Sequence, residues 1–273
     1  MALNNQDKPK KVEDVSNKPK SVNDIIAEQI QTGLSQHQRK NSRLFASSLA
    51  AGMEIGFSLF AMAIFYTIFY EKINGGGFNL IVAIGYSFGF IFVVIGRSEL
   101  FTEHTTLAVL PVLNKKASFI NLIKIWGIIY LGNLLGGYLF TFIILWVGPT
   151  MGTIDPKAFL YLAEKMLGYN WLITIGSGII AGWLMGLLSW LVSSAQETIS
   201  RIVIVFIIST LIGLGGLHHA IAGSVEVFAG LILEESINIS DYLHFQLWTT
   251  VGNIVGGVVF VAVIKYSTAD TEQ

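Results

Sequence analysis

Hydrophobic residues along this chain gather into six stretches that are separated by short polar connections. The stretches are Arg43–Tyr70, Phe78–Leu113, Phe119–Val147, Gly168–Ser194, Ser200–Leu233 and Tyr242–Tyr266. About 20 predominantly apolar residues suffice to cross a bilayer as a helix, so each stretch is long enough for one span. The second and fifth run past one bilayer thickness and are interrupted in the middle. The pattern therefore predicts an all-α membrane protein with six spans, of which the second and fifth are broken.

A polar segment, residues 1–42, precedes the first span and divides into two parts. Residues 1–20 carry several lysines and almost no large apolar side chains, which is typical of disordered chain. From Ser21 onward, apolar residues recur at helical spacing, and Ser21 can cap the first turn. We expect an amphipathic cytoplasmic helix here, followed by a transmembrane domain over residues 43–266 and a short tail over residues 267–273.

The overall composition supports this class of protein and excludes others. Hydrophobic residues make up 53% of the 273 residues and charged residues only 13%. Soluble domains carry roughly 25% charged residues. The net charge of −1 gives no indication of nucleic-acid binding, and the absence of cysteine excludes a disulfide framework and thiol chemistry.

Basic residues near the spans set the expected orientation, because cytoplasmic connections carry an excess of lysine and arginine. They are frequent in the N-terminal segment, and they recur at Lys115 and Lys116 in the second connection and at Arg201 near the fourth. We therefore expect a multi-pass protein of the plasma (inner) membrane with both termini in the cytoplasm.

The sequence contains an internal repeat. The motif Gly-Asn-x-x-Gly-Gly occurs in the third span, at Gly132–Gly137, and in the sixth, at Gly252–Gly257. The first and fourth spans share Ala-Gly-x-x-x-Gly, with Gly52 and Gly182 as the central glycines. Each half therefore holds three spans, and an odd number turns the second half over relative to the first. Small residues of this kind allow helices to approach closely, which is the structural explanation for both motifs.

The interruptions of the second and fifth spans occupy corresponding places in the two halves. They read "GRSELFTEHTT" at residues 96–106 and "GLGGLHHAIAGS" at residues 213–224. Non-helical backbone at membrane depth is tolerated only where protein buries it or where it lines a cavity. We expect these segments to be re-entrant loops that line a pore, with Asn133 and Asn253 hydrogen-bonded to the broken backbones.

Ionisable residues of the first loop are candidates for function, because such residues are costly inside a membrane. Arg97 is expected to pair with Glu54, Glu99 or Glu103, since an unpaired buried charge is far less stable than a paired one. Glu99 is expected to accept hydrogen bonds from loop amides and so hold the loop open. Glu103 and His104 form either a proton relay or a cap for the following half-helix.

Two adjacent histidines dominate the second loop. His219 is the candidate pore residue, because a protonatable imidazole can supply a proton or a positive charge to a passing solute. His218 lies about 100° away around a helix and is expected to face elsewhere. Its involvement in a relay or an ion pair is the open alternative.

Taken together, these segments resemble the formate/nitrite transporter family over roughly residues 25–266. "ELFT" at Glu99–Thr102 and "HHAIAG" at His218–Gly223 resemble the family's two broken-helix loops. "GIIAGWLMGLLSW" at Gly178–Trp190 resembles its fourth-span signature, and "AEK" at Ala163–Lys165 resembles the segment with the family's lysine before that span. The resemblance implies an aquaporin-like fold, a homopentamer with one pore per protomer, and passage of a small monovalent anion such as formate, nitrite or hydrosulfide, often with protons.

The resemblance also implies roles for individual residues. His219 matches the central histidine, Phe101 and Thr102 match the gating loop, and Lys165 matches a lysine that attracts anions at the outer vestibule. For Phe101 the alternative to a constriction is simple packing. For Lys165 the alternative is an ordinary interfacial lysine whose ammonium reaches water.

The chain departs from the family pattern at three places. Glu103 and His104 stand where the first loop usually continues with Gly-Asn. His218 begins the second loop in place of Glu, and Gly223 ends it in place of Asn. Gly182 replaces an Asn in the fourth span. The loops therefore lose polar groups and gain charges, so formate or nitrite as the substrate does not follow.

Three functions remain to be weighed. The leading interpretation is a proton-linked channel or transporter for a small weak-acid anion. The alternative keeps the fold but passes a cation or a small neutral solute, because several carboxylates are placed at membrane depth. An intramembrane metalloenzyme would use His104, His218 and His219, but adjacent histidines on a helix are poor co-ligands and no His-Glu-x-x-His motif occurs. We expect a protein that is not an enzyme and that needs no metal or other cofactor.

Overall fold

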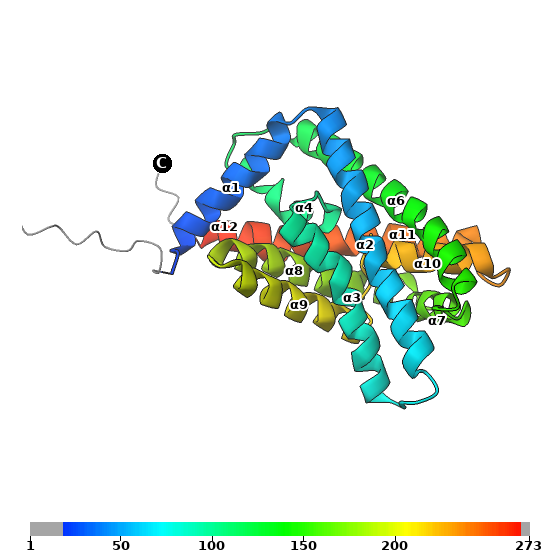
Figure 1. Ribbon diagram of the computed structural model, residues 1–273. Helices are drawn as coiled ribbons and strands as arrows, with labels where there is room; N and C mark the ends of the chain where they lie inside the picture. Colours follow the sequence, from blue (N-terminus) through cyan, green and yellow to red (C-terminus); the bar gives the residue numbers. More distant parts are fainter. Residues whose placement is uncertain (1–18, 269–273) are drawn as a thin grey trace, which may run out of the picture.

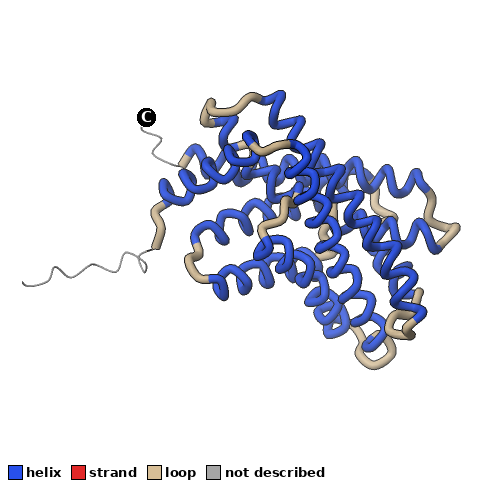
Figure 2. The backbone as a smooth tube through the Cα atoms, turned by 45° about the horizontal axis from the view of Figure 1, so that its top comes forward, coloured by secondary structure: helices blue, strands red, loops and turns tan. Residues whose placement is uncertain are grey.

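The computed structural model describes residues 19–268, and helices make up nearly all of this part of the chain (Figures 1 and 2). The helices are α1 (Val22–Gln38), α2 (Asn41–Phe69), α3 (Gly76–Gly96), α4 (Phe101–Leu107), α5 (Leu110–Leu113), α6 (Phe119–Thr150), α7 (Lys157–Met166), α8 (Trp171–Ser194), α9 (Thr198–Leu214), α10 (Ala222–Leu233), α11 (Ile239–Gly257), the π-helical turn η2 (Val258–Val263) and α12 (Ile264–Ser267). Most of the stretch expected to be disordered, residues 1–20, and of the tail, residues 267–273, lies outside the described residues.

Five helical segments of residues 19–268 are long and apolar enough to cross a membrane: α2, α3, α6, α8 and the continuous stretch Ile239–Ser267. The remaining span is divided into α9 and α10, which contain 17 and 12 residues. The second span is likewise divided, into α3 and α4. The predicted fold, six spans with the second and fifth broken, is therefore confirmed.

Glycines of the repeated motifs bring the helices of each half into backbone contact. In the first half, a Cβ atom at Gly52 of α2 would lie 2.1 Å from the carbonyl oxygen of Asn133 in α6. In the second half, a Cβ atom at Gly182 of α8 would lie 2.3 Å from the carbonyl oxygen of Asn253 in α11. The structural explanation of these motifs is correct. The same contact leaves no room for a side chain at Gly182.

The short half-helices α4 and α10 join the two halves. Each packs against spans of the opposite half: α4 against α8 and α11, and α10 against α2 and α6. A Cβ atom at Gly257 of α11 would lie 2.1 Å from Thr105 Oγ1 of α4, and one at Gly137 of α6 would lie 2.7 Å from Val225 Cγ2 of α10. The bundle is thus closed around the two broken spans.

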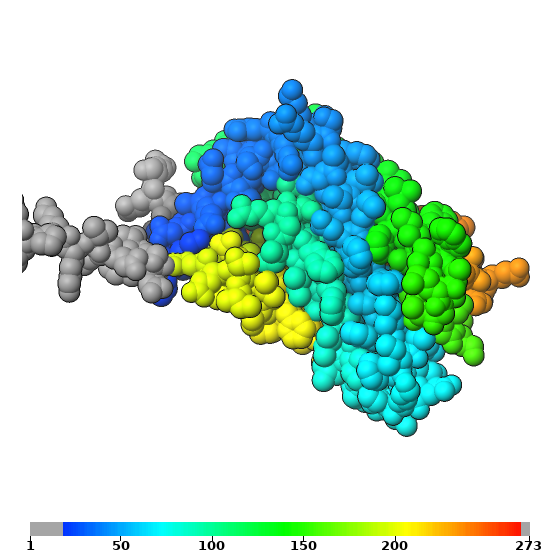
Figure 3. Space-filling view, viewed as in Figure 1, coloured from blue at the N-terminus to red at the C-terminus, as the bar shows by residue number. Residues whose placement is uncertain are grey.

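Helix α1 packs on α8 at one end of the bundle, near the beginning of α9, the helix that Figure 3 shows in yellow. It begins after Ser21, whose hydroxyl accepts the Asp24 N–H at 3.1 Å while the Asp24 carboxylate accepts the Ser21 N–H at 3.1 Å. Hydrogen bonds from Ser21 hold the pKa of the Asp24 carboxyl below its usual value. Ile25, Ile26 and Ile30 form its buried face, which packs on a cluster that includes α5. Helix α1 therefore covers the bundle end that carries both α4 and α5.

Candidate functional site

The two breaks have the same backbone geometry. After α3, Arg97 adopts the left-handed conformation (φ 58°, ψ 36°), and the Ser98 N–H donates to the Val93 carbonyl at 3.0 Å. After α9, Gly216 takes the equivalent conformation (φ 57°), and the Leu217 N–H donates to the Ile212 carbonyl at 3.1 Å. This is a common way to end a helix, and glycine is its usual residue. Arg97 is therefore an arginine at a position that glycine fills in the other half.

Asn133 and Asn253 hold the two breaks in place. The Asn133 amide group donates to the carbonyls of Ser48 and Glu99, both at 2.8 Å, and its oxygen accepts the Phe101 N–H at 2.8 Å. The predicted hydrogen bonds to broken backbone are confirmed at this site. The Glu99 carbonyl and the Phe101 N–H would otherwise be buried without a partner, at a cost of about 1–3 kcal/mol each.

The second asparagine repeats this arrangement. The Asn253 amide group donates to the carbonyls of Gly178 and His218, at 2.8 and 3.0 Å, and its oxygen accepts the Ala220 N–H at 2.8 Å. Each break is therefore fixed by one asparagine side chain. In each case its amide group donates to a carbonyl of the break, and its oxygen accepts an N–H two residues further along the chain. The inverted repeat extends to individual hydrogen bonds.

The two breaks meet at the contact between Thr102 and His219, where Thr102 Oγ1 lies 2.8 Å from His219 Nε2. Both side chains are fully buried. His219 Nδ1 accepts the N–H groups of Ala222 and Ile221, at 3.1 and 3.3 Å. Because Nδ1 is an acceptor, the proton of the neutral ring lies on Nε2, which donates to the threonine hydroxyl. The Phe90 ring stands edge-on to the imidazole, with 5.2 Å between centroids.

One cavity is lined by residues of α4, the half-helix that carries Thr102, and another by a residue of α10, the half-helix that follows His219. The inner cavity, on the side of α1, has a volume of about 360 Å³ and is lined in part by Arg97, Glu99, Glu103 and His104. The outer cavity, beside α7, has a volume of about 20 Å³, roughly the room of one water molecule. Among the described residues, no three His, Cys, Asp or Glu side chains are placed so that they could share a metal ion.

The expected ion pair of Arg97 is wrong. Glu99 is the buried carboxylate of this loop, and its partners are Arg39, whose Nη1 lies 2.6 Å from Oε1, and His104, whose Nε2 donates to Oε2. Arg97 is exposed and has no ion pair within residues 19–268, because Arg39 and His104 already occupy the Glu99 carboxylate. Glu54 Oε2 is buried without a hydrogen-bond partner in the same part of the chain.

Glu99 also differs from the expectation in what it binds. Its carboxylate accepts side-chain donors, and the loop is instead fixed through its backbone carbonyl by Asn133. Sequence reasoning missed Arg39, which ends α1 some 60 positions before its partner. Its place next to the first span was used only to orient the chain. The sequence offered one signal for this pair: Arg39 is a basic residue just before the first span, and Glu99 is a carboxylate in the loop that interrupts the second span.

Phe101 and His218 face away from the contact between the breaks. The Phe101 ring packs on α6, with 4.9 Å between its centroid and that of Tyr130, which supports the packing alternative. His218 Nδ1 lies 2.9 Å from Ser177 Oγ, and its ring lies 5.2 Å from that of Tyr169.

Lys165 lies near the end of α7 and lines the outer cavity together with Glu226. Its ammonium also stands over the Tyr161 ring, 5.2 Å from the centroid. Glu226 of α10 is buried, with 3% of its surface exposed. The outer cavity therefore combines one basic and one acidic side chain.

Known proteins share both the sequence pattern and the fold. Residues 23–267 match the family model described as formate/nitrite transporter. Inner membrane protein YfdC of Escherichia coli (strain K12) is 33% identical over 243 residues, 87% of this chain and 75% of that protein. Among solved structures, an FNT family ion channel has a TM-score of 0.80 at 21% identity over 90% of this chain and 99% of its own. A pentameric formate channel with formate bound has a TM-score of 0.68 at 25% identity, over 83% of this chain and 96% of its own. The chain therefore belongs to the formate/nitrite transporter family.

Proposed function

We propose that this protein conducts a small monovalent weak-acid anion, of the formate or nitrite type, across the inner membrane together with a proton. The observation that carries the proposal is the buried contact between Thr102 and His219, together with one cavity lined by α4, which carries Thr102, and another lined by α10, which begins just after His219. A solute that passes from one cavity to the other must part these two side chains. Family membership supports a small anion as the solute.

The surroundings of this contact favour a neutral form of the solute. Moving a bare anion from water into an apolar site costs several kcal/mol or more. The contact offers the fully buried Phe90 ring, which stands edge-on to His219, and its own neutral imidazole and hydroxyl. The protonated acid HX is uncharged and can exchange hydrogen bonds with Thr102 and His219 as it passes.

Lys165 supplies the attraction on the outer side. Its ammonium lines the outer cavity, where it raises the local concentration of anions before they are protonated. The cation–π contact with Tyr161 keeps the side chain near this position. Phe101 is not part of the proposed path, because its ring packs on α6.

The assembly and the orientation belong to the same proposal. One structural relative is a pentameric formate channel, and we propose a homopentamer with one pore in each protomer. Both termini lie in the cytoplasm, which is consistent with the basic residues around α1 and the α5–α6 connection. The inner cavity then faces the cytoplasm.

A second candidate function is passage of a cation or a small neutral solute through the same fold. Buried carboxylates favour it: Glu99 and Glu103 line the inner cavity and Glu226 lines the outer one. Negative charge at both ends of a path attracts cations and repels anions. The two candidates make opposite predictions for ion selectivity.

The test is stopped-flow uptake into proteoliposomes, using protein whose mass by light scattering corresponds to five copies. Formate, nitrite, hydrosulfide, acetate and glycerol are compared, with and without an inward proton gradient. We expect fast uptake of at least one weak-acid anion, acceleration by inward protons, and loss of at least ten-fold in rate for His219→Ala.

A control variant separates the pore from its surroundings. His218→Ala removes the neighbouring imidazole, which binds Ser177 outside the path, and should keep most of the wild-type rate. Uptake of glycerol or potassium without any weak-acid anion would replace the proposal by the second candidate.

A further inference from the structure

The inner cavity carries a set of ionisable side chains that the proposed function does not use. The lining groups are Glu28 from α1, Arg97 and Glu99 from the break, Glu103 and His104 from α4, and Arg201 from α9. Glu103 and His104 stand where the pattern described in the sequence analysis usually has Gly-Asn. Three carboxylates would repel an anion in this cavity, so their presence in a path for anions requires an explanation.

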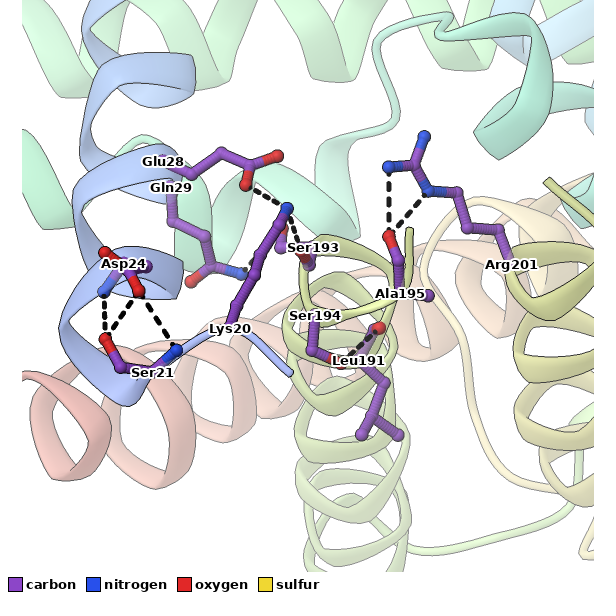
Figure 4. Close-up of polar contacts among 10 residues, drawn as sticks. All are labelled: Lys20, Ser21, Asp24, Glu28, Gln29, Leu191, Ser193, Ser194, Ala195 and Arg201. Carbon is purple, nitrogen blue, oxygen red and sulfur yellow. Dashed lines mark hydrogen bonds and ion pairs between the residues drawn. The ribbon is translucent and has the colours of Figure 1, made fainter. Parts of the chain in front are cut away.

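Most of these groups are already engaged. The Lys20 ammonium lies 2.5 Å from Glu28 Oε2 and donates to the Ser193 carbonyl at 2.7 Å (Figure 4). The Arg201 guanidinium donates to the Ala195 carbonyl at 3.0 and 3.2 Å, also drawn in Figure 4. These contacts leave the charges in place but fix the side chains at the mouth of the cavity.

Glu99 and His104 form a fixed pair deeper in the cavity. Arg39 and His104 both bind the Glu99 carboxylate, and the Trp126 indole N–H donates to the His104 carbonyl at 2.9 Å. His104 is 2% exposed, and its Nδ1 has no hydrogen-bond partner among the described residues. Nε2 donates to Glu99, so Nδ1 is open to a water molecule or a solute, as an acceptor in the neutral ring and as a donor in the protonated ring.

Glu103 differs from the other carboxylates of the cavity. It directly follows Thr102, the residue that contacts His219, and it is half-buried in the cavity lining. In the part of the chain that the structure describes, it has no ion-pair partner, whereas Glu28 is paired with Lys20 and Glu99 with Arg39. Glu103 is therefore a carboxylate of the inner cavity, one residue along α4 from Thr102, whose oxygens are not committed to a cationic side chain.

We infer that Glu103 is the proton-exchange group of the inner cavity and that Glu99 and His104 are positioning residues that fix its surroundings. This inference rests on the proposed function. A neutral acid HX that arrives from the constriction gives its proton to the Glu103 carboxylate. The bond between hydrogen and X breaks, a bond between hydrogen and a Glu103 oxygen forms, and X⁻ remains. The anion then moves toward Arg97 and Arg201, and Glu103 releases its proton to water. Export runs through the same steps in reverse.

The experiment measures formate flux and proton flux together in proteoliposomes from pH 5 to pH 8. Wild type is compared with Glu103→Gln, which has the same shape without an exchangeable proton, and with Glu28→Gln as the control from the same cavity. We expect Glu103→Gln to lose at least ten-fold in the rate of formate export at pH 7.5, because the anion lacks the group that protonates it, and to approach wild type at pH 5, where hydronium supplies that proton directly. A positioned proton-transfer group typically contributes about 10²–10⁴-fold. Added imidazole buffer should restore part of the rate at pH 7.5 in this variant alone.

Three results would overturn the inference. The first is a Glu103→Gln protein with the pH profile of wild type and of Glu28→Gln, which would leave the proposed function intact. The second is a loss of rate that is equal at all pH values and is not relieved by buffer, which indicates a structural role. If Glu103→Gln does not assemble, Glu103→Ala replaces it, and an unchanged rate and pH profile in that variant is the third. Absence of formate and other weak-acid flux in wild type would instead refute the proposed function.

Discussion

At the scale of single residues, the molecule depends on two asparagines that each satisfy three backbone groups. A carboxamide is suited to this position because it offers donors and an acceptor without charge. Inside a membrane no water is available to replace these bonds. The stability of each break is therefore concentrated in one side chain, Asn133 or Asn253.

Replacing Asn133 by Ala should destabilise the folded protein strongly. The change leaves the Glu99 carbonyl and the Phe101 N–H without their partner, and each buried orphan costs about 1–3 kcal/mol. We expect a clear drop in the midpoint of thermal unfolding in detergent and loss of transport. Asn79→Ala is the matched control, because Asn79 is exposed and accepts only a long hydrogen bond from Tyr161. Equal midpoints for the two variants would contradict this account.

Residue roles were predictable from sequence only where the repeat pointed to them. The recurrence of Gly-Asn-x-x-Gly-Gly identified Asn133 and Asn253 as residues that bind the breaks. The partner of Glu99 was not predictable in this way, because Arg39 belongs to α1, which has no counterpart in the second half. The left-handed backbone at Arg97 was hidden as well, since arginine rarely takes that conformation.

At the scale of helices, close approach decides the packing of α2 on α6 and of α8 on α11. Gly182 of α8 faces backbone atoms of α11. Backbone atoms cannot move aside for an added methyl group, whereas the end of a flexible side chain can. The sequence predicted these contacts because both motifs occur twice at matching places. It could not predict how α4 and α10 cross between the halves, because that depends on the fold as a whole.

A methyl group at Gly182 should therefore separate two helices. Gly182→Ala places a Cβ atom 2.3 Å from the Asn253 carbonyl oxygen, and overpacking of this kind costs about 1–3 kcal/mol. Gly176→Ala on the same helix meets nothing within 4 Å, and alanine is the better helix former by up to about 1 kcal/mol. Thermal unfolding in detergent should thus show a lower midpoint for Gly182→Ala and an equal or higher one for Gly176→Ala. The same sign for both would show that the contact does not control packing.

At the scale of the whole molecule, both ends of the described chain lie at the same end of the bundle. The Tyr266 hydroxyl near the C-terminus donates to Asn114 Oδ1 at 3.3 Å, just after α5, and α1 packs on α5 as well. An even number of spans, here six, brings the chain back to the side of the membrane from which it started. The sequence predicted it from span number and basic residues, whereas the covering of the inner cavity by α1 emerges only from the fold.

Cysteine labelling can test the orientation, because the chain contains no cysteine of its own. Ser35 is exposed on α1, and Ser240 is exposed in the first turn of α11 at the opposite end. In intact cells, a membrane-impermeant maleimide should label Ser240→Cys and leave Ser35→Cys unmodified. Permeabilised cells should label both. Modification of Ser35→Cys in intact cells would place the inner cavity outside the cytoplasm.

The asparagine bonds have a consequence for biosynthesis. Asn133 binds Ser48, Glu99 and Phe101, all of which precede it in the chain, and Asn253 binds only residues of the second half. The first three spans can therefore satisfy their interrupted backbone in the bilayer while the ribosome is still translating the remainder. The Glu99 carbonyl and the Phe101 N–H are thus paired before the second half is made, and they need not face lipid in the meantime. This should reduce the exposure of the incomplete chain to quality-control proteases.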